Sequence, residues 1–346
     1  MSQRIPAAVW ALAAVVVLTP LFAAAQPAET AEAPRTPWGA PDLQGVWDFR
    51  SLTPLERPAD LADQAFLTEE EAAELEQNAL ARNEELLNRP ARRTTVTQSV
   101  DRGEDGAPGF YNNFWLDGGT SPVETRRTSL IVDPPNGRKP AMTAASQQRQ
   151  AAIARERQGI GMHAPTPGGW VEDFGNEGLQ LRCITGFNSG PPMTPGGYNQ
   201  NVQLFQTPDQ VVLLNEMNHN FRVIPLDGRP TTGLPQWTGE SRGHWDGDTL
   251  VVETTNFLRE TSFSSGQTDQ YLHLTERFTR VSPTTLMYEA TVDNPTVWVT
   301  PWTYEIPMQW NEQPLYEYAC HEGNYGLYNI LAGARAEEAA AAQGSE

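Results

Sequence analysis

Cysteine and basic residues are both scarce in this 346-residue sequence. It has two cysteines, Cys183 and Cys320, and neither belongs to a C-x-x-C motif. This excludes a mini-protein stapled by several disulfides, which needs more cysteines. It also argues against a structural zinc site, which usually takes paired cysteine ligands. The 24 Lys and Arg residues face 43 Asp and Glu residues, which gives a formal charge of -19. Nucleic acid and anionic lipid bind positive surfaces, so neither is expected as a partner.

Several catalytic signatures are also missing. There is no G-x-S-x-G, no G-x-G-x-x-G after a strand pattern and no P-loop, so Ser-dependent acyl transfer, nicotinamide chemistry and phosphoryl transfer by their familiar routes lose support. No two of the histidines show the i, i+4 or H-x-H spacing that often gathers a metal. We therefore predict neither an organic cofactor nor a bound metal. The five histidines are His163, His219, His244, His273 and His321.

The N-terminus has the pattern of an export signal. Residues 5–22 are largely apolar, follow Arg4 and end in Ala23-Ala24-Ala25, which predicts a signal peptide over residues 1–25. The alternative is a membrane anchor, but Pro6 and Pro20 interrupt the apolar run. The mature protein is thus expected in the periplasm or outside the cell, without stable membrane insertion.

Export to an oxidising compartment favours a disulfide between Cys183 and Cys320. The alternative is two unpaired, buried thiols.

The rest of the chain predicts one mainly β domain. A flexible lead over 26–37 is followed by a single β-rich domain over 38–335 and a tail over 336–346. Thr68 and Glu71 form a capping-box pattern that starts a helix ending before Pro90, and a second helix is expected over 143–158. From residue 179 onward, short runs rich in Val, Leu, Thr and aromatics alternate with turn signals. This favours an antiparallel calycin-like barrel, or a sandwich, with the N-terminal helices packed outside.

Charged residues within the predicted strands suggest a site. One strand over 209–226 would place Glu216, Asn218 and Arg222 on the same side. A turn at Asp246-Gly247 would put Arg242 and His244 on one face of a hairpin. A turn over 282–285 would put His273, Arg277 and Tyr288 on one face, with Glu276 on the other. Small barrels enclose polar groups around a ligand, although each of these charges could equally lie on a solvent face.

Three segments carry a resemblance to known proteins: TPWGAPDLQGVW (36–47), SRGHWDGDTLVVETTNF (241–257) and YEYACHEGNYG (316–326). Together they resemble a family of exported bacterial proteins, and the resemblance covers nearly all of the mature chain. It implies export and one shared architecture, and it assigns no catalytic residue. Gly45-Val46-Trp47 is also similar to the G-x-W of lipocalins, which implies a distant calycin relationship.

These patterns lead to three functional hypotheses for an exported protein that binds a small molecule. The first is a cofactor-independent lyase, isomerase or hydrolase that acts by acid/base chemistry on a small polar molecule or sugar derivative. The second is a non-catalytic binding barrel, and the third is a glycosidase with two inward carboxylates. The oligomeric state is left open. In the enzyme hypothesis, the catalytic residues are Glu216, His244 and His273, and the substrate-binding residues are Asn218, Arg222, Arg242, Arg277 and Tyr288.

Overall fold

The structure is a computed structural model that describes residues 33–88, 117–156, 158, 176–259, 261 and 268–344. The predicted signal peptide and the lead up to residue 32 lie outside these ranges, as does His163.

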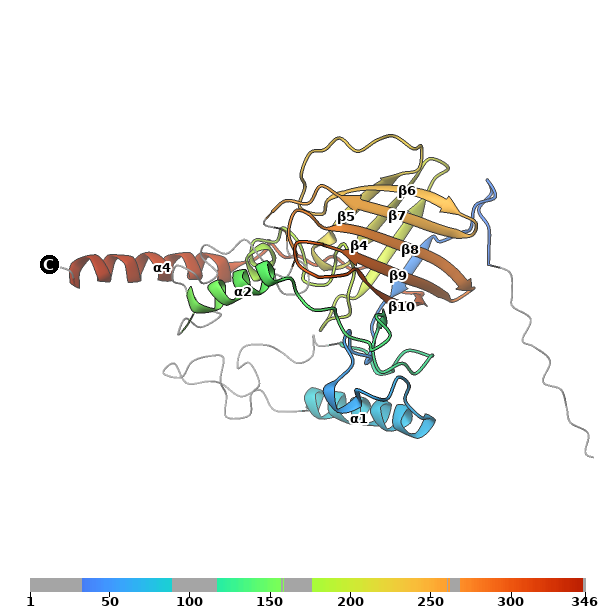
Figure 1. Cartoon of the computed structure of the whole chain (residues 1–346), viewed down its shortest axis with the longest axis horizontal. Coiled ribbons are helices and arrows are strands. Elements are labelled where there is room, and N and C mark those ends of the chain that lie inside the picture. The colour runs from blue at the N-terminus through green and yellow to red at the C-terminus, as the bar shows by residue number, and fades with distance from the viewer. Residues whose placement is uncertain are drawn as a thin grey trace, which may run out of the picture. The chain divides into compact units, whose positions relative to one another are not determined.

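The described chain is built on one antiparallel sheet of ten strands (Figure 1). Nine strands follow the order β5-β4-β3-β1-β10-β9-β8-β7-β6, and β2 pairs with β10 beside this path. This confirms the prediction of a mainly β, antiparallel protein. The strands are β1 (Gly45–Asp48), β2 (Ile131–Asp133), β3 (Asn201–Gln206), β4 (Gln210–Asn215), β5 (Phe221–Pro225), β6 (Glu240–Asp246), β7 (Thr249–Thr255), β8 (His273–Ser282), β9 (Thr285–Asp293) and β10 (Trp302–Asn311).

The sheet curls, but it does not close into a barrel by strand pairing. The two edge strands, β5 and β6, share no ladder in the described chain and meet through side chains instead. A Cβ on Gly243 of β6 would lie 2.8 Å from a methyl group of Ile224 on β5, so a larger residue at this seam would force neighbouring side chains to shift. The curl also brings Arg222 on β5 to Glu276 on β8, three strands away through β6 and β7. The interior is therefore enclosed without a complete hydrogen-bonded wall.

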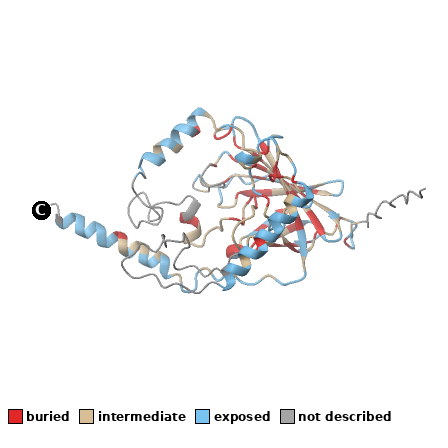
Figure 2. Ribbon diagram, turned by 90° about the horizontal axis from the view of Figure 1, so that it is seen from below, coloured by how far each residue is buried: buried red, intermediate tan, exposed pale blue. Residues whose placement is uncertain are grey.

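In the described ranges, four helices accompany the sheet: α1 (Glu69–Asn88), α2 (Ala144–Glu156), α3 (Asn176–Leu181) and α4 (Tyr325–Gly344), with short 3-10 turns at Ala59–Leu61 and Met217–His219. The predicted capping box is confirmed at α1. The Thr68 N–H donates to Glu71 Oε2 at 2.8 Å, and the Glu71 N–H donates to Thr68 Oγ1 at 3.1 Å. The segment predicted as a tail, 336–346, is helical up to residue 344, where it forms the end of α4. Figure 2 shows that α1, α2 and α4 are largely exposed and that the buried residues gather in the sheet.

Aromatic side chains dominate the core inside the curled sheet. Trp47, Trp302 and Tyr304 are fully buried there. At the β8–β9 end, the Arg280 guanidinium lies 5.1 Å from the Trp47 ring and 5.4 Å from the Trp310 ring. Its Nη1 donates to the Asp42 carbonyl at 2.7 Å, so this arginine joins the N-terminal segment to the sheet. Cation–π contacts and a main-chain hydrogen bond thus close this end of the core.

The predicted strand over 209–226 is instead two strands. β4 ends at Asn215 and β5 begins at Phe221, and the two form an antiparallel hairpin. Asn218 and His219 in the turn have positive φ values of 55° and 42°. Asparagine tolerates this left-handed region better than most residues, so the asparagine-rich run was a turn signal that alternation alone missed.

Two other hairpin registers also differ from the predicted ones. The β6–β7 turn lies one residue later, at Gly247-Asp248, and His244 pairs with Val251 rather than Thr249. This two-residue change in pairing leaves the faces as predicted.

Between β8 and β9 the turn is where we expected it, but the register shifts between Arg280 and Ser282. A one-residue shift reverses the faces, so Tyr288 pairs with Phe278 and points inward beside Glu276, not outward with Arg277.

The predicted disulfide is confirmed. Cys183 and Cys320 are bonded across a sequence separation of 137 residues. The bond ties the loop after α3 to the segment before α4.

Candidate functional site

The two histidines proposed as catalytic lie apart on the outer side of the sheet. Both are exposed. Val251 pairs with His244 on one side and with Arg277 on the other, and His273 lies four residues from Arg277 along β8. Strand geometry then separates the two imidazoles by about 13 Å along the strands and about 10 Å across them. They do not share a proton-transfer site, because alternation placed them on one face without fixing their positions along it.

Glu216, the third proposed catalytic residue, lies in the β4–β5 turn. Its Oε2 accepts a hydrogen bond of 2.8 Å from Asn201 Nδ2, and Asn201 Oδ1 accepts one of 2.9 Å from Asn311. This half-buried carboxylate joins the ends of neighbouring strands. No histidine donates to it in the contacts of the described chain.

Arg242 and Arg277, proposed as substrate-binding residues, are engaged in ion pairs with acidic side chains. Arg277 Nη2 lies 2.9 Å from Asp246 Oδ2 on the outer surface. Arg242 Nη2 donates to Glu240 Oε1 at 2.6 Å, and its other nitrogens donate to the carbonyls of Arg229, Pro230 and Ser241. Both arginines therefore hold the protein's own groups.

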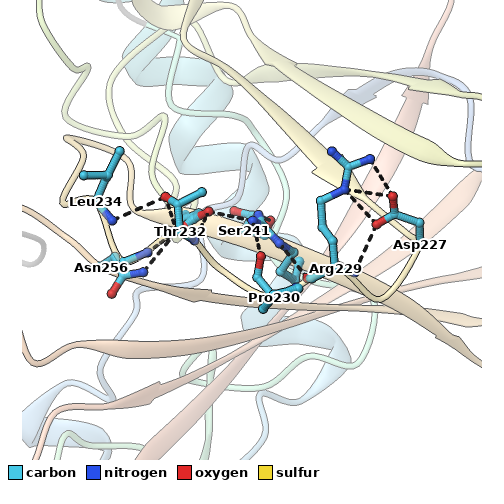
Figure 3. A network of polar contacts seen from close by, with 10 residues as sticks. Asp227, Arg229, Pro230, Thr232, Leu234, Ser241 and Asn256 are labelled. Atoms are coloured by element: carbon cyan, nitrogen blue, oxygen red, sulfur yellow. Dashed lines mark hydrogen bonds and ion pairs between the residues drawn. The ribbon is translucent and has the colours of Figure 1, made fainter.

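Figure 3 shows a polar network that includes Thr232 and Asn256, and both of these residues donate to Glu240. Besides Arg242, its carboxylate accepts hydrogen bonds from the Thr232 and Gly233 N–H groups and from Asn256 Nδ2. Burial of Glu240 acts to raise its pKa, but these hydrogen bonds together outweigh burial and lower the pKa to about 2. The network fixes the loop between β5 and β6, which makes it a structural site.

Arg222 and Tyr288 are the two predicted residues that the structure brings together inside the sheet. Arg222 Nη1 and Nη2 donate to the two Glu276 oxygens at 2.6 and 2.9 Å, and the Tyr288 hydroxyl donates to Glu276 Oε1 at 2.9 Å. Desolvation and the nearby Glu276 raise the Tyr288 pKa well above its usual value. Sequence analysis had placed Glu276 on the opposite face, and the bulge accounts for the difference.

This interior network is covered by a proline-rich segment. Met193 is fully buried; its N–H donates to the Tyr288 hydroxyl at 3.1 Å, and its carbonyl accepts from the Tyr304 hydroxyl at 2.6 Å. The interior of the curled sheet is thus occupied by Met193 and aromatic side chains. The Glu276 carboxylate and the Tyr288 and Tyr304 hydroxyls are hydrogen-bonded there, whereas Arg222 Nε has no hydrogen-bonding partner in the described chain.

A surface hollow of about 500 Å³ lies over the same segment, and we call it the Lys139 hollow. Its lining combines proline, glycine and apolar side chains with hydroxyl groups, backbone polar groups and one amine. The lining includes Leu55, Lys139, Phe187, Pro192, Thr194 and Trp237.

Lys139 is the functional candidate that the sequence analysis missed. It is the only lysine among the 24 basic residues, and this rarity was the signal available. Its side chain is 15 % exposed, its Nζ lies 5.6 Å from the centre of the Trp302 ring, and Glu56 Oε2 lies 3.9 Å away. Desolvation lowers the Lys139 pKa, and the negative charge of Glu56 partly opposes this effect. A shielded cation over an aromatic ring thus lies in the wall of a ligand-sized space.

A second hollow of about 560 Å³ adjoins the first, because Trp237 lines both; we call it the Asn218 hollow. Its wall includes Ile184, Asn218, His219, Phe221 and Leu258. Asn218, proposed earlier as a binding residue, is 5 % exposed, and neither its Nδ2 nor its Oδ1 has a hydrogen-bonding partner in the described chain.

Neither a metal-ligand cluster nor a membrane-spanning helix occurs in the described ranges. No three His, Cys, Asp or Glu residues that the structure describes are grouped as a metal site. Within these ranges, no helix combines the length and the apolar character needed to cross a bilayer. Comparison with family models, with curated proteins and with solved structures found no match for this chain.

Proposed function

We propose that this protein binds a small organic molecule that carries a carboxylate or a similar anionic oxygen, and that the Lys139 hollow is the binding site. The observation that carries this proposal is the position of the Lys139 ammonium, which is largely shielded from solvent in the wall of the hollow. This corresponds to the binding-protein hypothesis, with the site placed on the surface hollow instead of inside a barrel.

The size and chemistry of the hollow support this function. Small-molecule sites usually occupy about 300–1,000 Å³ and combine apolar walls with a few polar groups. Here Phe187 and Trp237 offer aromatic surface, and Thr194 offers a hydroxyl group. Proline and glycine have little or no side-chain freedom, so binding at this wall would immobilise few long side chains.

The charge of Lys139 supports the anionic ligand. A partly desolvated ammonium attracts an anion more strongly than one in bulk water, because the effective dielectric constant around it is lower. Glu56 is 46 % exposed and lies 3.9 Å from the ammonium. An incoming carboxylate would meet a cation that lies over the Trp302 ring.

The geometry favours binding over the two catalytic hypotheses. Glu216, His244 and His273 lie in different parts of the fold, which removes the proposed proton-transfer pair. A glycosidase needs two available carboxylates. The buried ones in the described chain are Glu240 and Glu276, and each accepts hydrogen bonds from an arginine and from other groups.

We also propose that the protein is exported and is distantly calycin-like. The disulfide supports export, since such bonds persist in oxidising compartments. The curled antiparallel sheet, with Gly45-Val46-Trp47 in its first strand, supports the calycin relationship.

The test is a comparison of charged and neutral probes. We expect 4-phenylbutyrate to bind more tightly than 4-phenylbutanamide, and Lys139→Gln to weaken the carboxylate about tenfold without affecting the amide. Arg229→Gln, which removes an exposed cation elsewhere, is the matched control. Calorimetry would measure the dissociation constants. Equal binding of both probes, or unchanged carboxylate binding by Lys139→Gln, would refute the proposal.

A further inference from the structure

The Asn218 amide is a buried polar group whose hydrogen-bonding capacity is unused in the described chain. Both Nδ2 and Oδ1 are shielded from solvent, and neither has a partner there. Leaving a buried polar group unpaired is unfavourable, so such groups nearly always pair with protein, water or a ligand. Asn218 therefore needs a partner from outside the described residues.

The backbone holds this amide at the wall of a hollow. Asn218 lies in the 3-10 turn between β4 and β5, with φ 55°, and Met217 before it is fully buried. The neighbouring loop is fastened to the same turn, because Asn220 Nδ2 donates to the Ile184 carbonyl and its Oδ1 accepts from the Gly186 N–H. The buried Met217 before Asn218 and the hydrogen bonds of Asn220 after it thus hold the turn in place.

Trp237 connects this group to the Lys139 hollow, since its side chain is part of both walls. A ligand lying across Trp237 would therefore contact both hollows. An asparagine amide presents a donor and an acceptor side by side. It therefore matches a secondary amide, which offers a carbonyl acceptor and an N–H donor.

We infer that the Asn218 hollow is a second subsite that pairs with an amide group of the ligand, so that the protein recognises N-acylated amino acids or related acylamino carboxylates. This inference rests on the proposed function for the carboxylate end and extends it by naming the other end. The acyl group would lie against Trp237 and the apolar wall formed by Ile184 and Leu258.

The test uses hippurate and benzoyloxyacetate, which differ in one position: the amide N–H of hippurate is an ester oxygen in the second molecule. We expect hippurate to bind about fivefold more tightly, as for one neutral hydrogen bond. Asn218→Gly tolerates the positive φ and removes the amide, so this preference should disappear while the ester retains its affinity. Asn199→Gly is the matched control, because Asn199 also has a positive φ, of 51°.

Calorimetry would measure the ratio of the dissociation constants of hippurate and benzoyloxyacetate. NMR of the Asn218 side-chain NH₂ resonances would detect direct contact with the ligand. A preference that survives in Asn218→Gly, or the absence of any preference in the wild type, would overturn the inference. If hippurate leaves the Asn218 NH₂ resonances unchanged, the amide does not contact the ligand, and this result would also overturn the inference. The proposed function is judged separately by Lys139→Gln, whose loss of carboxylate binding does not depend on the amide.

Discussion

Arg222 on β5 and Glu276 on β8 form a two-point ion pair inside the curled sheet, with nitrogen–oxygen distances of 2.6 and 2.9 Å. Their side chains are 4 % and 0 % exposed. β5 and β6 share no ladder in the described chain, so this pair helps to connect the two ends of the sheet across the interior.

Removing one partner of this pair should strongly destabilise the fold. Glu276→Gln leaves the Arg222 charge buried without its counter-ion, and we expect the free energy of unfolding to fall by about 3–5 kcal/mol. Urea denaturation would measure the change. Asp246→Asn, which breaks an exposed pair with Arg277, should cost less than about 1 kcal/mol. Similar small losses for both variants would contradict a structural role for Glu276.

Glu240 should make stability depend on pH in the acidic range. Its folded pKa of about 2 lies below its ordinary value of 4.5, so the folded state binds this proton more weakly than the unfolded state. The resulting stabilisation is fully present above pH 4.5 and is lost as the pH falls towards 2. Thermal melting between these values should show a smaller decrease for Glu240→Gln than for the wild type. Parallel curves for the two proteins would exclude this contribution.

The disulfide should contribute through the long loop that it closes. The chain-entropy model gives a stabilisation of about 5 kcal/mol for a loop of this length. Cys183→Ser is therefore expected to lower the melting temperature under non-reducing conditions. In a reductant that opens the bond, the variant and the wild type should melt together. A difference that persists in the reductant would show that the substitution acts through packing.

The capping box should stabilise the first turn of α1. Thr68→Ala removes the side-chain acceptor of the Glu71 N–H, and a loss of about 1 kcal/mol in local stability is expected. Hydrogen exchange of the first-turn amides would detect it as faster exchange. Glu74→Ala, an exposed change further along the same helix, serves as the control and should leave these amides unaffected.

Ligand binding should weaken at alkaline pH if Lys139 holds the anion. A carboxylate ligand stays ionised at alkaline pH, so a change in its affinity would report the protonation of the Lys139 amine. Because desolvation lowers the Lys139 pKa, affinity should begin to fall at a lower pH than for an ordinary lysine at 10.5. Calorimetric titration of 4-phenylbutyrate at increasing pH would show this decrease. Lys139→Gln should show no such dependence, whereas an identical pH profile in this variant would assign the titration to another group.

Sequence patterns were sufficient for features that depend on neighbours along the chain. The Thr68–Glu71 box, the 282–285 turn and the mainly β class follow from local hydrogen bonding and from alternation. The pairing of Cys183 with Cys320 followed from the presence of two cysteines in a chain whose sequence predicts an export signal. In each case, the residues involved had few alternative pairings.

The site depended on features that are not local. One extra residue in the bulge after Arg280 moved Tyr288 to the inner face, since side chains alternate strictly along a strand. The turn at Asn218 separated Glu216 from the strand that carries Arg222. Lys139 showed only its rarity in the sequence, and its place over Trp302 arises where segments distant in the chain meet. Local composition determined the strands and caps, whereas tertiary packing decided which charges are enclosed, because burial is a property of all surrounding segments together.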